Sequence, residues 1–318
     1  MTAIGQRLMT PVVIGSRRYP SIGLLILAAI GGSLLLIVAA TEWRHLNDEY
    51  AYWLAGSRLA AGASPYDIAA APNTPYAYWY PPPLAQILAP LTSFVSADAF
   101  SVAWTALLLV CLWWLAGRDV LVALALIAFL PVAVELRVRN VHLALAALSV
   151  LALRRSPLFW VPATALKITP VLAIAYLAAA GRWRAAFLVA VAGLAVLGVS
   201  VVLAPGAWQA FLDVAGVRAG ADGGSVLPIP FAVRFAAGAV LAVAAGRLAL
   251  RAEQAGASAR VAEALLIMAL TIANPTLWVT ALAMLVAIVP LWRTAAPRRT
   301  TPTAGAAPTA VQPEVSPA

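Results

Sequence analysis

The chain has 318 residues, of which 63% are hydrophobic and only 10% are charged, and its formal net charge is +9. A soluble domain usually carries about 25% charged residues, so this composition excludes a water-soluble globule and predicts a chain largely covered by membrane lipid. The basic residues lie in short clusters between apolar runs, which is the positive-inside pattern of membrane proteins. A nucleic-acid-binding protein would gather them on one polar face, so we expect no nucleic-acid partner.

The N-terminal segment, residues 1–20, is expected to lie in the cytoplasm and to precede a first membrane-spanning helix at about 21–40. An apolar run of this length can cross roughly 30 Å of hydrocarbon as a helix. Arg17 and Arg18 precede the run as in a signal peptide, but no small-residue cleavage site follows it. We therefore interpret it as an uncleaved helix.

The later apolar segments predict an all-α, polytopic transmembrane protein whose membrane domain covers residues 21–294. Two long runs are interrupted, by Lys167–Pro170 and by Asn274–Pro275, and proline inside an apolar run kinks or ends a helix. Broken helices at membrane depth persist only beside protein or a wet cavity. With the basic clusters in the cytoplasm, both runs become hairpins that reach toward the outer face, provided that 84–97 does not span. The other expected segments are 99–116, 120–134, 141–153, 157–180, 185–204, 230–250 and 261–292.

Residues 295–318 are rich in alanine, proline and threonine and lack periodicity, which predicts a disordered cytoplasmic tail. Cys111 is the single cysteine, so the chain has no intrachain disulfide. We find no acidic cluster with metal-ligand spacing, and we expect no obligatory metal and no cofactor. We also find no internal repeat, so a transporter built from inverted repeats gains no support.

The loop at 41–83 is expected to lie outside the membrane, and it holds four of the 12 acidic residues. Asn47 or Asp48 can cap a helix that runs to about Ala61, and Gly62 can end it. We expect this helix to lie flat at the membrane interface, with aromatic residues at headgroup level. The plain alternative is that Asp48 is only a helix cap and that the aromatics at 76–80 are an interfacial belt.

Three short motifs occur in this loop: Asp48-x-x-x-Tyr52-x-x-Ala55, Gly62-x-x-Pro65-Tyr66 and Tyr80-Pro81-Pro82. Together they resemble glycosyltransferase family 87, which contains GT-C-class transferases that use polyprenyl-phosphate sugars. Two later segments agree, since Lys167-x-x-Pro170 and Asn274-Pro275-x-x-Trp278 are similar to motifs of the family. The resemblance implies a GT-C-like membrane enzyme that moves mannose or arabinofuranose from a polyprenyl-phosphate donor to an envelope glycolipid or glycan. It also implies an active site on the extracytoplasmic side of the plasma membrane.

The resemblance implies that Asp48 is the catalytic base of a single displacement with inversion. A carboxylate within about 3 Å of a sugar hydroxyl can take its proton during attack. Glu49 is an alternative base, although neighbouring helix positions point about 100° apart, so only one of the two can face the site. The residues that we expect to line the substrate are Glu49, Tyr52, Tyr66, Tyr80, Asn274 and Trp278.

The charge that develops on the donor phosphate needs cations, for which Lys167, Arg137, Arg139 and His142 are candidates. Each has a simpler alternative. Lys167 could extend to the headgroups, Arg137 and Arg139 could pair with Glu135 at an interfacial turn, and His142 could face the headgroups.

Two other classes of protein stay open at this point. A lipid or small-molecule transporter also has many helices and buried charges. A non-catalytic GT-C-like subunit of an envelope-synthesis complex would fit the segment Arg139-Asn140-Val141-His142, where many family members carry Gly-Gln-x-Asn. Val279 and Thr280 also stand where members often have a histidine.

Overall fold

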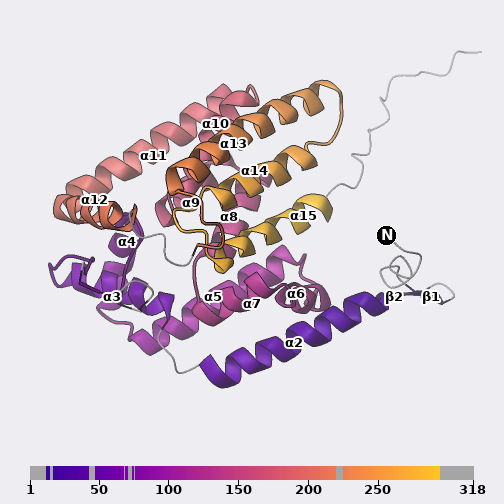
Figure 1. The fold of residues 1–318 in the computed structure, drawn as a ribbon, viewed down its shortest axis with the longest axis horizontal. Coiled ribbons are helices and arrows are strands. Elements are labelled where there is room, and N and C mark those ends of the chain that lie inside the picture. The colour runs from indigo at the N-terminus through magenta and orange to yellow at the C-terminus, as the bar shows by residue number, and fades with distance from the viewer. Residues whose placement is uncertain are drawn as a thin grey trace, which may run out of the picture.

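The computed structural model describes residues 12–14, 17–42, 47–67, 69–70, 74, 76–219 and 225–293. Most of them are helical, and Figure 1 shows the helices side by side in one bundle. A short antiparallel hairpin of β1 (Val12–Ile14) and β2 (Arg17–Tyr19) precedes the first helix, where the sequence predicts no strand. The hairpin is confined to the N-terminal segment, so the predicted all-α polytopic membrane protein is confirmed. The predicted tail at 295–318 lies outside the described residues.

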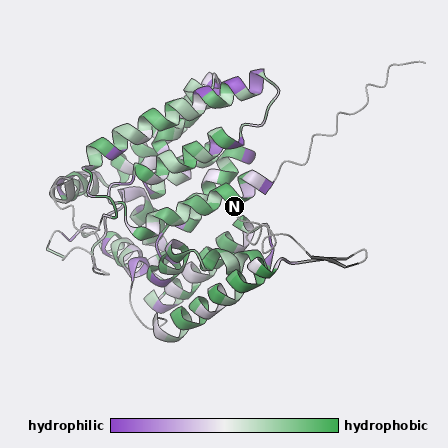
Figure 2. Ribbon diagram, turned by 45° about the vertical axis from the view of Figure 1, so that its right-hand side comes forward, coloured by the Kyte–Doolittle hydropathy of each residue, from purple (hydrophilic) through white to green (hydrophobic). Residues whose placement is uncertain are grey.

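Four of the described helices are long and apolar enough to cross a membrane, and a bent pair brings the number to five. In the bent pair, α6 (Val120–Ile127) and α7 (Leu130–Val138) meet at 89°. Large apolar side chains are exposed on these helices, as lipid contact requires. Figure 2 shows that hydrophobic residues predominate along the helices of the bundle. The four straight spans are α2 (Ile22–Glu42), α5 (Ala97–Leu115), α11 (Trp183–Leu203) and α13 (Phe231–Gln254).

The first predicted break is present and forms the tip of a hairpin. α8 (His142–Arg154) leads into the 3-10 turn η1 (Pro157–Phe159) and then α9 (Trp160–Leu166), which ends at Lys167 because the backbone there is extended. The chain returns through η2 (Thr169–Val171) and α10 (Leu172–Ala179). Residues 157 and 182 line one small cavity, so the hairpin begins and ends at the same side of the bundle.

The second break, at Asn274–Pro275, has the same form. α14 (Arg260–Ile272) reaches it, and the 3-10 helix η3 (Val279–Ala287) leads away into α15 (Ile288–Arg293). Arg154 donates to Glu263 at 2.9 Å and to the carbonyl of Leu291 at 3.1 Å. The two arms of this hairpin therefore also meet at the side of the bundle where α8 ends.

Three shorter helices gather at the end reached by both breaks, on the left of Figure 1: α3 (Asp48–Ala60), α4 (Pro82–Thr92) and α12 (Pro205–Ala219). α4 has 11 residues, about half the length that a span needs, so it does not cross the membrane. Gln86 of α4 donates to the carbonyl of Ser200 at 2.7 Å, and Trp208 of α12 donates to the hydroxyl of Ser200 at 2.9 Å. These bonds fasten α4 and α12 to the end of α11.

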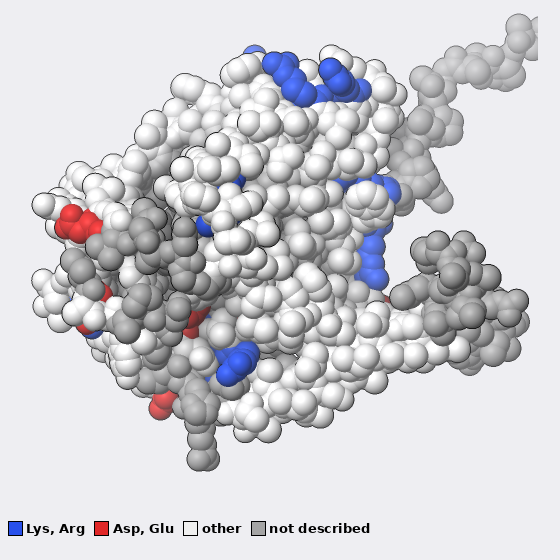
Figure 3. Space-filling model, viewed as in Figure 1, with Lys and Arg blue, Asp and Glu red and all other residues white. Residues whose placement is uncertain are grey.

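Charged side chains divide between the two ends of the bundle. Figure 3 shows acidic side chains near α3 and α12, and most of the basic ones over the other end, near α10, α11, α13 and α15. At that basic end Arg182 pairs with Glu253, and Arg293 donates to the carbonyl of Ala116 at 2.9 Å. This division is the one that the positive-inside pattern predicts for a chain that crosses the membrane several times.

Close contacts between helices depend on glycines of α13. A Cβ atom at Gly246 would lie 2.4 Å from the carbonyl oxygen of Tyr176 on α10, and one at Gly238 would lie 2.8 Å from that of Ala269 on α14. Small residues permit such approach between membrane helices, where packing replaces the hydrophobic effect as the driving force. α13 can therefore pack closely against both broken hairpins, because glycine at these two positions leaves room for the neighbouring backbone.

We predict that Gly246→Ala lowers the free energy of unfolding by about 1–3 kcal/mol, because the new methyl group forces α10 and α13 apart. Gly193→Ala on α11 is the matched control, since nothing lies within 4 Å of its Cβ position. Thermal unfolding in one detergent compares the two. Equal melting temperatures for both variants would contradict the close contact.

Candidate functional site

A cavity of about 350 Å³ opens at the end of the bundle that holds both breaks. Asp48 and Tyr52 of α3 line one part of it, and Lys167 at the first break and Trp278 beyond the second break line others. Segments far apart in sequence thus meet around one space. Most of the wall is apolar, and α12 contributes Phe211, Leu212, Val214 and Ala215 to it.

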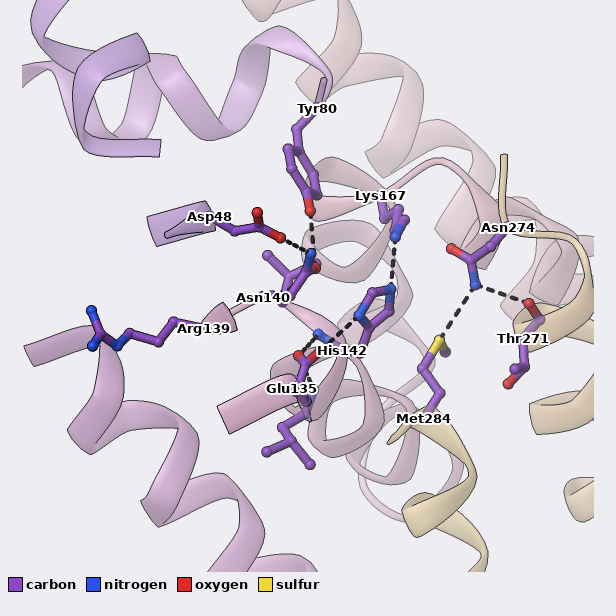
Figure 4. A network of polar contacts seen from close by, with 12 residues as sticks. Asp48, Tyr80, Glu135, Arg139, Asn140, His142, Lys167, Thr271, Asn274 and Met284 are labelled. Carbon is purple, nitrogen blue, oxygen red and sulfur yellow. Dashed lines mark hydrogen bonds and ion pairs between the residues drawn. The ribbon is translucent and has the colours of Figure 1, made fainter. Parts of the chain in front are cut away.

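A chain of hydrogen bonds fixes the Asp48 carboxylate at the cavity wall (Figure 4). The side-chain amide of Asn140 donates to Asp48 Oδ2. The Asn140 carbonyl oxygen accepts from the Tyr80 hydroxyl at 2.9 Å and from the Val141 amide at 2.7 Å. Tyr52 in turn donates to the Tyr80 hydroxyl at 3.0 Å. Asn140 thus orients Asp48, and the two tyrosines orient Asn140.

Burial raises the pKa of Asp48 from its usual 3.8 to about 7. Desolvation is the largest cause, the hydrogen bond from Asn140 opposes it, and the nearby carboxylates of Glu135 and Glu49 add to the rise. Lys167 lowers the value by its positive charge. A carboxyl group with a pKa near neutrality is well suited to accept a proton at physiological pH.

A second polar chain runs from Glu135 through His142 to Lys167 (Figure 4). The Lys167 ammonium lies 2.7 Å from His142 Nε2, and His142 Nδ1 lies 3.0 Å from Glu135 Oε2. An ammonium group can only donate, so Nε2 accepts and Nδ1 carries the proton that is donated to Glu135. Glu135 also accepts from the backbone amides of His142 and Leu143 at 2.6 and 3.3 Å. The buried carboxylate therefore fixes the imidazole, and the imidazole holds the ammonium at the cavity.

Arg234, at the start of α13, brings a second cation to the cavity. Its side chain is 2% exposed and donates to three backbone carbonyls, those of Ile229, Asn274 and Pro275, at 2.7 to 2.8 Å. These bonds join the segment before α13 to the second break. Arg234 was not among the predicted site residues, although an arginine inside the apolar run 230–250 is a usable signal.

The sequence profile of glycosyltransferase family 87 matches residues 78–311, about three quarters of the chain. The chain belongs to glycosyltransferase family 87. The matched region contains Asn140, His142, Lys167 and Arg234, whereas Asp48 lies before it. No curated protein and no solved structure matches the chain. The predicted family is confirmed, and the protein is a membrane glycosyltransferase.

In this family 87 protein, Glu49 and Arg139 lie away from the cavity and pair with each other. Arg139 donates to Glu49 and, at 2.8 Å, to the hydroxyl of Ser101, and the side chains of the ion pair are only 5% and 1% exposed. Arg139 has a left-handed backbone (φ 55°) between α7 and α8, and its carbonyl accepts from Trp104 at 2.9 Å. The predictions that Glu49 lines the substrate and that Arg139 binds phosphate are therefore corrected. Asp48 takes the cavity side of α3, and Glu49 turns to α5.

Three other predicted site residues do not line the cavity of this glycosyltransferase. Arg137 is exposed on α7, and its carbonyl accepts from Asn47 at 3.1 Å. Tyr66 is buried, and its hydroxyl donates to the carbonyl of Tyr80 at 2.8 Å. Asn274 is fully buried, and its side-chain amide donates to the carbonyl of Thr271 at 3.0 Å. Tyr66 and Asn274 shape the segments beside the cavity, and Arg137 takes no part in it.

Asn140 and Glu135 were also missed as functional residues. Asn140 holds Asp48, and Glu135 holds His142, one of the candidates for contact with the donor phosphate. A buried acid on an apolar helix is a usable signal for Glu135. No group of His, Cys, Asp or Glu side chains that could hold a metal occurs among the residues that the structure describes.

We predict that Glu49→Ala lowers the free energy of unfolding by about 3–5 kcal/mol, because it leaves the guanidinium of Arg139 buried without its counter-charge. Asp67→Ala is the control, since Asp67 pairs with Arg58 at 3.2 Å where the side chains are 39% and 27% exposed. An exposed pair contributes about 0–1 kcal/mol, so this variant should unfold almost as the wild type. Chemical unfolding in detergent measures both, and equal losses would argue against a buried pair at Glu49.

Proposed function

We propose that the protein transfers mannose or arabinofuranose from a polyprenyl-phosphate donor to an envelope glycolipid or glycan, at the extracytoplasmic face of the plasma membrane. The observation that carries this proposal is a single cavity lined by both the Asp48 carboxylate and the Lys167 ammonium. A base and a phosphate-binding cation are the two groups that such a transfer needs. A non-catalytic subunit needs no carboxylate poised to accept a proton, and the match to glycosyltransferase family 87 favours a transferase over a transporter.

In the proposed reaction the acceptor hydroxyl attacks the anomeric carbon from the face opposite the phosphate. The new glycosidic bond forms as the bond from that carbon to the phosphate oxygen breaks, so the configuration inverts. The hydroxyl proton passes to Asp48, and the electron pair of the broken bond leaves with polyprenyl phosphate. Asn140 and Tyr80 keep the carboxylate aimed at the cavity.

The negative charge that stays on the leaving phosphate is matched by cations of the cavity. Lys167 is held there by His142, and its ammonium also lies 5.8 Å from the centre of the Tyr80 ring. Arg234 adds a second positive charge at the same cavity. Fixed charges in a site with little water stabilise a developing anion more than mobile charges in solvent do.

The apolar wall of the cavity suits the lipid part of the donor. Ile168, Phe211, Leu212 and Phe231 line it beside Lys167. A prenyl chain placed along this wall would leave its phosphate beside Lys167 and its sugar toward Asp48. In this arrangement the prenyl chain contacts the apolar wall, whereas the phosphate and the sugar lie at the polar side chains of the cavity.

The decisive experiment measures sugar transfer by the purified protein in lipid vesicles. Labelled polyprenyl-phosphate mannose and polyprenyl-phosphate arabinose are supplied separately, with envelope glycolipid as acceptor. We predict that Asp48→Asn lowers the rate by about 10²–10⁴-fold, as expected for loss of a general base, while the protein still folds and inserts. Asp67→Asn, which changes a carboxylate of the same loop outside the cavity, should keep wild-type activity. Wild-type turnover in Asp48→Asn would remove Asp48 from the role of base.

The raised pKa of Asp48 predicts a pH dependence. The carboxyl group must be ionised to accept a proton, so kcat/KM should rise with pH up to about 7 and level off above it. On the acid side the fall should approach about tenfold per pH unit, because one protonation inactivates the base. The pH profile of kcat/KM in vesicles measures this, and a midpoint near the usual value of 3.8 would contradict the buried carboxylate.

A further inference from the structure

A second cavity, of about 170 Å³, lies at the opposite end of the bundle from the first. His142 at the start of α8 lines the first cavity, and Arg154 at its end lines the second. The helix between them has 13 residues, so the two sites are about 20 Å apart along α8. The second cavity therefore belongs to no part of the proposed transfer reaction.

Three arginines line this cavity, and two of them have acidic partners. Arg154 forms two bonds of 2.9 Å with Glu263, and Arg182 pairs with Glu253. Arg155 is exposed and makes no side-chain hydrogen bond with the described part of the chain. The three arginines and two glutamates leave the cavity with one positive charge that no carboxylate of the described residues balances.

One residue of the cavity wall has a buried donor without an acceptor. Trp160 is 0% exposed and lines the cavity, and its indole Nε1 has no partner among the described residues. A buried N–H group without an acceptor destabilises the folded protein, so an acceptor for this one would be favourable.

A helix N-terminus adds further donors. Gly181, with φ +75°, turns the chain from α10 into α11, and Arg182 and Ala185 at the start of α11 line the cavity. The first amides of a helix have no acceptor within it, and Arg182 offers no side-chain cap. In the last turn of α10, the carbonyls of Tyr176 and Leu177 already accept from the amides of Ala180 and Arg182, each at 2.9 Å. The 21-residue helix α11 therefore presents its positive end to the cavity.

We propose that this cavity binds a phosphate group carried by the headgroup of an anionic phospholipid. The guanidinium of Arg155, the indole N–H of Trp160 and the first amides of α11 would donate to the phosphate oxygens. The setting favours a lipid over free phosphate, because the cavity lies between membrane helices at the basic end of the bundle, where anionic headgroups gather. The simpler alternative is that Arg155 serves only as a topology determinant, which would leave Trp160 without an acceptor.

The test uses the full-length protein in a neutral detergent and follows thermal unfolding as lipid is added. A ligand that binds only the folded protein raises the melting temperature. Phosphatidylglycerol is the probe, and phosphatidylcholine and inorganic phosphate at the same concentrations are the comparisons. Four proteins are measured: the wild type, Arg155→Ala, Trp160→Phe and Arg184→Ala. Arg184 is the matched control because it is an exposed arginine at the start of α11 that does not line the cavity.

We expect phosphatidylglycerol to raise the melting temperature of the wild type and of Arg184→Ala more than either comparison does. Arg155→Ala should weaken the apparent affinity about tenfold or more, as expected for loss of a charged hydrogen bond, and Trp160→Phe should weaken it less. Equal stabilisation of all four proteins would overturn the site. Stabilisation by inorganic phosphate or phosphatidylcholine that equals that by phosphatidylglycerol would overturn its assignment to an anionic lipid. No sugar transfer is measured, so failure here leaves the proposed function untouched.

Discussion

A charged side chain at membrane depth must find a partner or a wet cavity, and this constraint governs the whole molecule. Lys167 lies at the tip of a broken helix pair, and the imidazole of His142 meets it there. Arg234 donates to carbonyls that the second break exposes at Asn274 and Pro275. The breaks leave backbone carbonyls free to accept these bonds, whereas in a continuous helix the same carbonyls would bind backbone amides. The cavity lies at the same two breaks.

The helical membrane architecture could be predicted from the sequence, because the lengths of apolar runs and the positions of prolines determine where helices begin and end. The length of an apolar run is enough to show that it can span the membrane. Pro170 and Pro275 interrupt their helices whatever the tertiary contacts around them, because proline lacks the N–H group that a helix needs. The family could also be recognised, because each of its motifs, in the loop at 41–83 and at Lys167 and Asn274, is a short contiguous stretch of sequence. The hairpin of β1 and β2 was not foreseen, since pairing between such short strands leaves little trace in composition.

The partners of the charged groups could not be predicted, because they depend on contacts between distant segments. Asp48 and Glu49 were both candidates until the packing of α3 against α5 turned Glu49 toward Arg139. Asn140 was noted only as a departure from the family motif, yet its amide holds the carboxylate of Asp48. Pairing of Glu135 with Arg137 or Arg139 was one of two alternatives, but the turn after α7 places His142 against Glu135. In each case helical spacing gave the direction of a side chain, and only the tertiary fold gave its neighbour.

The bonds that hold α3 in place have a consequence for the order in which the molecule is made. Asp48 and Asn140 are 92 residues apart in sequence, and Glu49 and Arg139 are 90 apart. At about 5–20 residues per second of synthesis, α3 waits several seconds for the partners that fix it. The part of the cavity that holds Asp48 therefore assembles only after the turn between α7 and α8 has been made, whereas α2 can enter the membrane long before.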